Sequence, residues 1–491
     1  MGEILANRNR YIIPFIFQTK GNGFDAIIKE VSNVPDWQMD NMHPEGVEQD
    51  VYSIILNCFV QNEQQSNIGC SFSYCLEKKP ILSLNYSRFE DDFTVSVWDM
   101  GIFLFRTGVG LIWYEFSVPD DTSLEQMVLF QNEFKELSYA RFVSRRSESQ
   151  NYTFSLADDH EQPLLMGHWI DSILKGMPFE YDYFASRQDP LEENHSVCDK
   201  ALIFLYLASG KSEKENVFDD LYHLTNGYND RYQRKGSFAD EIIEPFENAF
   251  CYASASGCGY FAVPKESNMN FYLRTFKKKI MLDYFLLYIL ALYQSYSLLK
   301  FTKEMQSELS AEPKIYMEDS ADTLQTLKRL ETEINVFLIK SVYSSVSHIG
   351  HQNDYYEYVI QRLKVSENID GLTVGLESLQ KLQESRERDR LAEIEKQENL
   401  EQEVSDDRLN IGLGLISILA IISAISDGNG SASVIVDLFR LPTVAVDIIN
   451  GILLAVILVV AIFAISSLAP SISRARRKRR KLKQSMNKRP E

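Results

Sequence analysis

The stretch Leu409–Ser426 reads LNIGLGLISILAIISAIS and decides how the rest of the chain is interpreted. It holds 18 residues without a charge, which as a helix is about 27 Å long, enough to cross the core of a bilayer. A second uncharged run, Gly451–Ala469, reads GILLAVILVVAIFAISSLA. The two runs predict two transmembrane helices, 409–426 and 451–469. The polar segment between them, 427–450, contains Asp427 and Pro442 and is predicted to be an external loop.

The chain ends in a dense basic tail. Between Arg474 and Arg489 there are ten Lys or Arg residues and no acid. Because positive charge beside a span stays on the cytoplasmic side, the tail 470–491 is predicted to be cytoplasmic. Two spans return the chain to the side where it began, so both termini are expected in the cytoplasm and the protein in the cell inner membrane. A nucleic-acid or localisation patch is the alternative interpretation of the tail.

The body that precedes the tail is strongly acidic. Residues 1–473 hold 40 bases and 68 acids. Binding to nucleic acid needs clustered Lys and Arg, so no direct nucleic-acid partner is expected. The content of 45% hydrophobic and 24% charged residues is typical of a folded chain. Six scattered cysteines without a CxxC pair favour free thiols in a reducing cytosol.

The pattern of the body predicts an α/β cytosolic domain over 1–266 and a helical cytosolic region over 267–371. Runs of β-branched and aromatic residues predict strands at Tyr11–Gln18, Val51–Gln61, Ser71–Leu76, Ile81–Tyr86, Phe93–Trp98 and Ile102–Phe105. Glycines at 108 and 110 predict a hairpin turn into Leu111–Val118. Ser123 and Gln126 predict the start of a helix that runs through Phe142. Helical spacing then predominates at 270–310, 317–345 and 355–364.

A third apolar stretch, Ile280–Leu299, reads IMLDYFLLYILALYQSYSLL. It contains Asp283 and Gln294, and a span here would put the two halves of the cytosolic body on opposite sides of the membrane. We therefore predict a buried helix of the cytosolic body.

The residues before the first span predict a long stalk helix, 372–408. Apolar residues follow one another at steps of three and four, beginning with Leu372, Leu376 and Leu379, while the other faces are highly charged. A stripe this narrow predicts packing against copies of the same helix in a homo-oligomer. A solvated coiled-coil face explains most of the charge.

A cytosolic α/β body, a stalk helix that enters the first span, a short external segment and a second span followed by bases together resemble the CorA family of divalent-cation channels. The resemblance covers roughly residues 270–480 and implies a pentamer whose first span lines a pore. The Gly-Met-Asn signature of that family is missing, since Asp427-Gly428-Asn429-Gly430 stands in its place. The Mg²⁺ selectivity filter of the family is therefore not carried over.

Two short motifs resemble the divergent CorA-like proteins associated with type III CRISPR systems. They are Ser347-His348-Ile349-Gly350-His351-Gln352-Asn353 before the stalk and the turn Phe105–Gly110. The resemblance implies a membrane effector of antiviral defence that is opened by an adenylate second messenger, of which conjugated S-adenosylmethionine–AMP is the known type. No other cofactor is expected, and a divalent cation is a possible permeant ion.

The candidate ligand-binding residues belong to two glycine-containing segments. Small residues let backbone amides approach a phosphate, and flanking aromatic side chains could stack on a base. The alternative for both segments is a tight turn or a closely packed loop. The ligand-binding residues predicted on this basis and from the resemblance are Arg106, Thr107, Gly108, Ser254, Ser256 and Gly257.

The candidate pore-lining residues are the small or polar positions of the first span, at steps of three and four. They are Asn410, Gly414, Ser417, Ala420, Ala424 and Asp427. Close helix packing is the alternative explanation of such a stripe. In an oligomer Asp427 would form a ring of carboxylates at the outer mouth, and the acids from Glu393 to Asp407 a collar at the inner end, so a preference for cations is expected.

No sequence pattern assembles a catalytic site, so an enzyme is not expected. His348 and His351 have a spacing that can chelate a metal on a helix, although packing is the favoured role and the metal is left open. Three functions stay in competition: a ligand-gated channel, a constitutive Mg²⁺ transporter, and a scaffold or sensor that the two spans merely tether.

Overall fold

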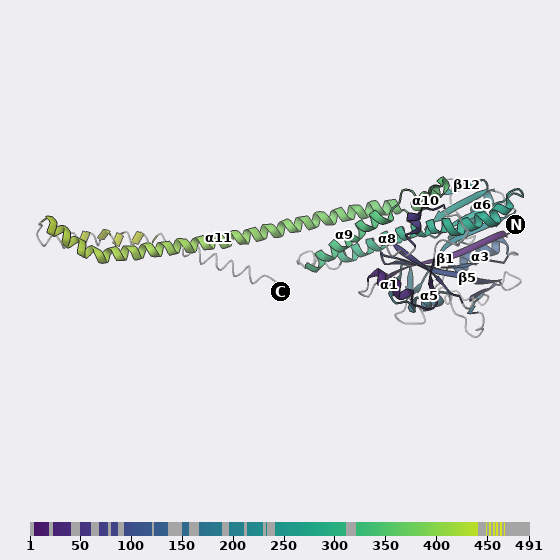
Figure 1. Ribbon diagram of the computed structural model, residues 1–491, viewed down its shortest axis with the longest axis horizontal. Coiled ribbons are helices and arrows are strands. Elements are labelled where there is room, and N and C mark those ends of the chain that lie inside the picture. The colour runs from purple at the N-terminus through teal and green to yellow at the C-terminus, as the bar shows by residue number, and fades with distance from the viewer. Residues whose placement is uncertain are drawn as a thin grey trace. The chain divides into compact units, whose positions relative to one another are not determined.

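The computed structural model is shown in Figure 1. The described residues are 4–18, 23–40, 50–59, 68–76, 80–86, 93–119, 122–135, 150–156, 166–188, 196–210, 214–228, 232, 241–310, 321–439, 448, 451–452, 455–456, 458–459, 462–463 and 466. They divide into two compact units, Met1–Leu376 and Glu377–Glu491.

The first unit is built on a sheet of 12 strands in the order β12-β13-β14-β11-β1-β6-β5-β3-β2, with β4 and β7 joined through β5 and β8 paired to β1. Only β11 and β14 pair in parallel among the described strands. The strands of this sheet are β1 (Ile4–Gln18), β2 (Trp37–Met39), β3 (Gly69–Tyr74), β4 (Pro80–Tyr86), β5 (Phe93–Phe105), β6 (Val109–Phe116), β7 (Gln150–Leu156), β8 (Glu180–Tyr183), β11 (Leu202–Ser209), β12 (Ile243–Phe246), β13 (Ala249–Ser254) and β14 (Gly257–Ala262). A separate pair is formed by β9 (Ser186–Gln188) and β10 (Ser196–Cys198).

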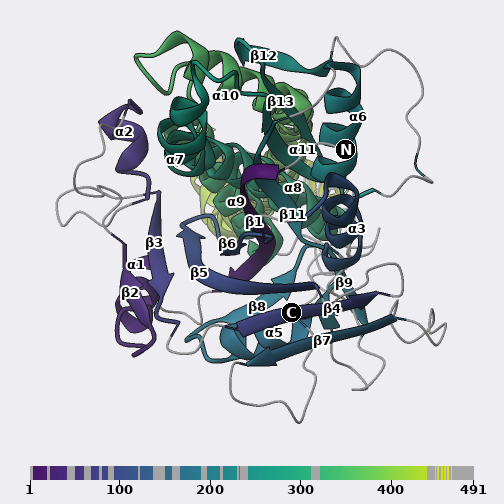
Figure 2. The same ribbon diagram turned by 90° about the vertical axis from the view of Figure 1, so that its right-hand side faces the viewer.

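Helices cover both faces of this sheet. The helices of the described residues are α1 (Phe24–Val31), α2 (Ser53–Leu56), α3 (Leu124–Phe134), α5 (Met166–Lys175), α6 (Lys214–Asn226), η2 (Phe271–Phe276), α7 (Lys277–Lys279), η3 (Ile280–Tyr284), α8 (Phe285–Ser310), α9 (Ala321–Ser341), α10 (Gly350–Arg362) and α11 (Val365–Phe439). One apolar core joins α1, α3, α5 and α6 to alternate side chains of the sheet, such as Tyr11, Ile13 and Phe15 of β1. Figure 2 shows α3 and α6 side by side.

The opposite face of the sheet is covered by α8. Its first residue, Phe285, packs edge-on against Trp113 of β6 and Phe204 of β11, with ring centroids 5.6 and 5.2 Å apart. Further along, Tyr293 stacks on Phe105 at 4.1 Å. Because successive side chains of a strand point to opposite faces, the sheet is apolar on both and is buried between two helical layers.

The prediction of a buried helix at Ile280–Leu299 is confirmed. Among the described residues, the helical stretch Phe271–Ser307 is the one long and apolar enough to cross a membrane, but 78% of its most apolar window is buried inside the protein. Asp283 and Gln294 are fully buried as well. The central helix, as we name Phe271–Ser310, begins with two π-helical segments, η2 and η3.

Three local predictions are wrong in detail. Val51–Gln61 is not a strand over its described part, because Tyr52 is the N-cap of the short helix α2 and only Val51 makes a β-bridge, to Ser347. The strands expected at 93–98 and 102–105 are one strand, β5, with an irregularity between Val97 and Asp99. The helix capped by Ser123 has the predicted capping box but ends at Phe134; residues 136–142 lie outside the described residues.

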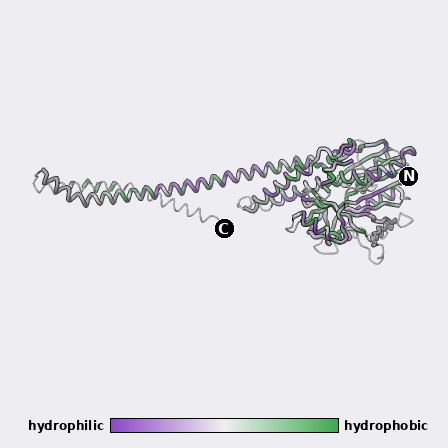
Figure 3. The backbone as a smooth tube through the Cα atoms, in the orientation of Figure 1, coloured by the Kyte–Doolittle hydropathy of each residue, from purple (hydrophilic) through white to green (hydrophobic). Residues whose placement is uncertain are grey.

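The second unit contains most of α11, which begins at Val365 in the first. The predicted stalk and first span are thus described as one helix. Figure 3 shows hydrophilic residues along the middle of α11 and hydrophobic ones nearer its end. The helix was predicted to end at Ser426 and continues to Phe439, so the first part of the expected loop, 427–439, is helical. The glycines at 428 and 430 do not end the helix, because an interior glycine costs only about 1 kcal/mol.

Candidate functional site

The first predicted ligand segment is the turn between β5 and β6, and it packs on the central helix. Thr107 Oγ1 hydrogen-bonds the buried Ser297 Oγ at 2.9 Å. Gly108 has φ +79°, and a Cβ there would lie 2.9 Å from Phe17 O, so glycine is required by backbone geometry. Arg106 is exposed and pairs with Asp25 at 2.7 Å. The turn interpretation explains Thr107 and Gly108 fully.

The second predicted segment is the two-residue hairpin turn between β13 and β14. Ser254 Oγ donates to Asn226 Oδ1 at 2.8 Å and accepts from the backbone N–H of Ser256 at 3.0 Å. A Cβ at Gly257 would lie 2.3 Å from Ile203 O, so this glycine allows β14 to approach β11. Close packing of the two strands therefore explains why a glycine stands at position 257. This is the alternative interpretation that the sequence left open.

The structure does not bring the two segments together. Gly257 lies opposite Ile203, which lies opposite Tyr11 of β1, whereas Val109, at the end of the other turn, lies opposite Ile16. Three strand spacings and five residues along a strand separate them, roughly 20 Å in all. Arg106 and the Ser254–Gly257 turn therefore lie at two different places on the sheet, and their role in ligand binding stays a prediction.

An aromatic surface lies beside the Ser254–Gly257 turn. Tyr222 of α6 lies between Tyr228 and Tyr252, with ring centroids 5.7 and 6.0 Å away, and Tyr228 stacks on the exposed Tyr232 at 5.0 Å. The guanidinium of Arg362 lies 5.7 Å from the Tyr252 ring. We call these four tyrosines the tyrosine surface, although only Tyr232 is well exposed and Tyr252 is buried. Flat π-faces next to a guanidinium and hydroxyl groups can stack a nucleobase and pair with a phosphate.

Helix α10, which precedes the stalk, is hydrogen-bonded to the residues beside the Ser254–Gly257 turn. Tyr358 of α10 accepts from the backbone N–H of Ala253 at 3.0 Å and donates to Glu241 O at 2.6 Å. Arg362 donates to Ala253 O at 3.0 Å and to Glu241 Oε2 at 2.8 Å. These bonds join β13, which leads into the Ser254–Gly257 turn, to the last turn of α10, and α11 begins at Val365.

A buried ion pair that the sequence did not reveal lies under the N-terminal end of the central helix. Arg10 Nε donates to Glu115 Oε2 at 2.6 Å, and its Nη1 donates to Met281 O at 2.7 Å. A second arginine, Arg8, donates to the other oxygen of Glu115 at 3.0 Å. A π-helical turn leaves a carbonyl without its usual partner, and Arg10 supplies the donor for Met281. The ion pair therefore anchors η3 to the sheet.

The two histidines do not form a chelating pair. His348 precedes α10 and is exposed near Tyr52, whereas His351 Nδ1 is 2.6 Å from the hydroxyl of Tyr284. Burial lowers the pKa of His351 and so favours the neutral ring, whose Nδ1 can accept a hydrogen bond from the Tyr284 hydroxyl. No group of three metal-ligating side chains occurs among the described residues.

The predicted pore residues lie on α11. Asn410, Ser417 and Ala420 are exposed, Gly414 is half-buried, and the side chains of Ala424 and Asp427 lie outside those described. Ser417 Oγ donates to Leu413 O at 2.9 Å, which satisfies its hydroxyl within the helix. Apolar side chains beside these positions are exposed as well, with Leu409, Leu413 and Ile416 at 62%, 59% and 63%.

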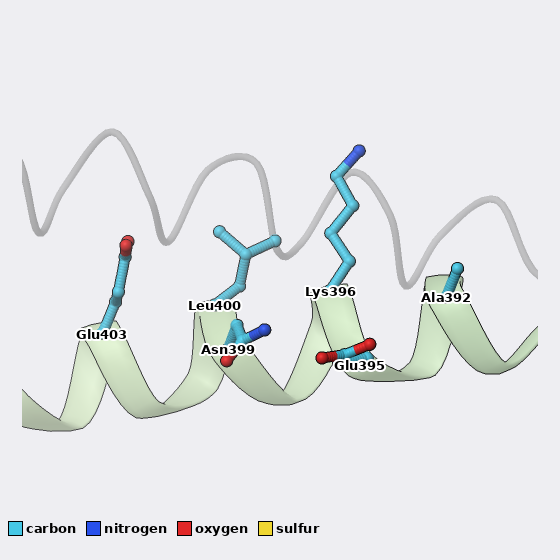
Figure 4. Close-up of a pocket in the computed structure, with 6 residues that line it drawn as sticks. All are labelled: Ala392, Glu395, Lys396, Asn399, Leu400 and Glu403. Atoms are coloured by element: carbon cyan, nitrogen blue, oxygen red, sulfur yellow. The ribbon is translucent and has the colours of Figure 1, made fainter.

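A shallow hollow lies on one side of α11. Figure 4 shows its lining residues, all of which project from α11: Ala392, Glu395, Lys396, Asn399, Leu400 and Glu403. Their spacing of three and four places them on one helical face, and two of them belong to the acidic collar expected from the sequence.

No protein-family model, curated protein or solved structure matches the chain.

Proposed function

We propose that the protein is a CorA-like oligomeric membrane channel of the inner membrane, opened by an adenylate second messenger of the S-adenosylmethionine–AMP type in antiviral defence. The cytosolic unit would bind the messenger, and the residues from 409 onward would enter the bilayer. The termini would lie in the cytoplasm, and the pore would prefer cations.

One observation carries the proposal. Large apolar side chains are exposed on helical residues in both predicted spans, and they include Leu413, Ile416, Ile452, Val459 and Phe463 at 59% or more. Soluble proteins rarely leave contiguous apolar surfaces uncovered, and hydrocarbon or a second membrane helix is the natural cover for a run without charge.

The stalk supports assembly into an oligomer. Leu391 and Ile394 of α11 are exposed at 60% and 42% within a segment that is otherwise highly charged. Apolar residues one turn apart on a solvated helix are what a coiled-coil partner buries. A pentamer follows from the resemblance to CorA.

The tyrosine surface is the most suitable place for the messenger. Adenine would stack on the exposed Tyr232, and Arg362 would contact phosphate. A ligand opens a pore only when it binds the open and closed states with different affinity. The contacts of α10 with Ala253 and Glu241 give a direct route from this surface to α11, because any shift of β13 changes the hydrogen bonds of Tyr358 and Arg362.

Isothermal calorimetry on the detergent-solubilised protein tests the ligand. We expect binding of an S-adenosylmethionine–AMP conjugate, and a loss of roughly 5- to 150-fold in affinity for Tyr232→Ala, since base stacking contributes about 1–3 kcal/mol. Tyr52→Ala is the matched control, because Tyr52 is also exposed and lies in the 50–59 segment. Full affinity of Tyr232→Ala would remove the tyrosine surface, and no binding by folded wild type would remove the messenger.

A further inference from the structure

A buried acid faces a buried amide where the central helix meets α10. Asp283 of η3 and Gln352 of α10 are both fully buried, and Gln352 Nε2 lies 3.4 Å from Asp283 Oδ2. The other oxygen of each side chain, Asp283 Oδ1 and Gln352 Oε1, has no hydrogen-bond partner among the described residues. Buried polar atoms are nearly always paired, so these two oxygens need a donor.

One proton on Asp283 supplies what this pair lacks. A carboxylic acid and a primary amide can join by two hydrogen bonds, in which the amide N–H donates to one acid oxygen and the acid O–H donates to the amide oxygen. The first contact is present, and the two unpaired oxygens are those of the second. An ionised carboxylate has only acceptors, so turning the amide over cannot satisfy both oxygens.

The charged groups around Asp283 come from three elements. Lys279 of α7 pairs with the Asp50 carboxylate, which lies ahead of α2, and His351 of α10 contacts Tyr284, the next residue. Burial raises the pKa of Asp283 to about 6, and the charge of Asp50 adds to the rise. The Lys279 ammonium, the Gln352 amide and the backbone N–H of Asp50 oppose it. The net effect of these groups is a pKa above the ordinary value, so Asp283 is protonated at a higher pH than an aspartate in water.

We propose that Asp283 is a proton-operated latch, which closes its pair with Gln352 when it takes up a proton from solvent and thereby holds α10 against the central helix. Lys279, whose side chain is 36% exposed, lies at the solvent edge of the group. Only Leu363 and Lys364 separate α10 from α11, so the latch acts at the start of the stalk helix. It does not depend on the channel proposal.

The sign of the pH effect follows from the direction of the pKa shift. When α10 opens, Asp283 returns to an ordinary pKa near 3.9, so protonation favours the closed state. The stabilisation of the closed state grows as pH falls through about 6 and is lost as pH rises through it. The lowered pKa of His351 acts in the opposite direction, because charging that ring at acid pH weakens the closed state.

Hydrogen–deuterium exchange of the α10 amides in the full-length protein at pH 7.5 and pH 5, corrected for intrinsic rates, tests the latch. We compare wild type with Asp283→Asn, whose side-chain amide can donate to Gln352 at every pH. The effect of His351 on the pH dependence is present in both proteins and therefore cancels in the comparison. Relative to this variant, wild-type protection should rise about tenfold at pH 5, the change expected when a pKa of about 6 returns to 3.9 on opening. Glu357→Gln, an exposed acid on the same helix, should behave as wild type.

Equal pH dependence in wild type and Asp283→Asn would overturn the proposal. If Asp283→Asn does not fold, Gln352→Glu decides, because two buried carboxyls share one proton and should move the wild-type transition to higher pH. An unmoved transition in Gln352→Glu, or no transition in wild type, would equally overturn it.

Discussion

Replacing Glu115 with Gln should destabilise the first unit, Met1–Leu376, because it removes the counter-charge of a buried arginine. Arg10 is 8% exposed, stacks on Trp113 and Phe285 at 4.5 and 4.1 Å, and would exchange its carboxylate partner for a neutral amide oxygen while keeping Met281 O. Breaking a buried ion pair on one side costs roughly 3–5 kcal/mol.

We expect a cost at the lower end of that range, because a second acid, Asp99, also interacts with Arg10. Burial raises the pKa of Asp99, the charge of Glu115 adds to that rise, and Arg10 opposes it. Without Glu115, the Asp99 carboxylate ionises more readily and compensates part of the loss. We expect about 3 kcal/mol, which at a slope near 3 kcal/mol per M lowers the urea midpoint by about 1 M.

Tryptophan fluorescence during urea unfolding measures this directly. The chain has four tryptophans, and Trp98 and Trp113 lie under the guanidinium groups of Arg8 and Arg10. Glu247→Gln, which removes an exposed partner of Lys265, is the control and should change stability by less than about 1 kcal/mol. A midpoint of Glu115→Gln equal to that of the control would refute the view that this ion pair anchors η3.

Three further substitutions test the fold and the assembly. Gly257→Ala should lower the free energy of unfolding in urea by roughly 1–3 kcal/mol, because its Cβ would meet a backbone oxygen at 2.3 Å. Gly371→Ala in α11, where a Cβ would have nothing within 4 Å, is the control and should be neutral or stabilising. Equal effects of the two substitutions would contradict the packing role of Gly257. Tyr206→Phe removes the donor to Tyr272 O in η2 and should cost about 1–2 kcal/mol by the same assay, whereas Tyr288→Phe, whose hydroxyl has no partner among the described residues, should cost little. The double change Leu391→Glu, Ile394→Glu should reduce the oligomer to smaller species in mass measurements in detergent. Lys396→Glu changes the net charge by the same amount on another face of the helix and should leave the oligomer intact. An intact oligomer in the double variant would exclude the stalk contact.

Much of the local structure could be predicted where residue chemistry leaves few choices. Polar Asp283 and Gln294 inside an apolar run distinguished a core helix from a span, and Ser123 with Gln126 located a helix start. The Val51–Gln61 error has a physical cause: a short apolar run suits either a strand or a helical turn, and its outcome depends on the distant bond from Tyr52 N–H to Val346 O.

The candidate sites were less predictable because they depend on contacts between distant segments. Glycines at 108 and 257 indicated close approach, but the sequence could not say that a neighbouring strand, rather than a phosphate, comes close. The Asp283–Gln352 pair joins residues 69 apart, and Arg10 and Glu115 are 105 apart. Arg10 closes the polar run Asn7-Arg8-Asn9-Arg10 of β1, whereas Glu115 stands in the apolar strand β6, and nothing local to either residue indicates that they pair.

The central proposal is a cation-preferring pore that a ligand opens, and the reversal potential of the reconstituted protein in planar bilayers tests it most directly. With an S-adenosylmethionine–AMP conjugate on the cytosolic side, we predict a ligand-dependent current that reverses near the cation equilibrium potential. In Asp427→Lys the reversal potential should move toward that of the anion, because the ring of charge at the mouth changes sign. No current with ligand, or the same reversal potential in both proteins, would contradict the proposal and favour a membrane-tethered scaffold.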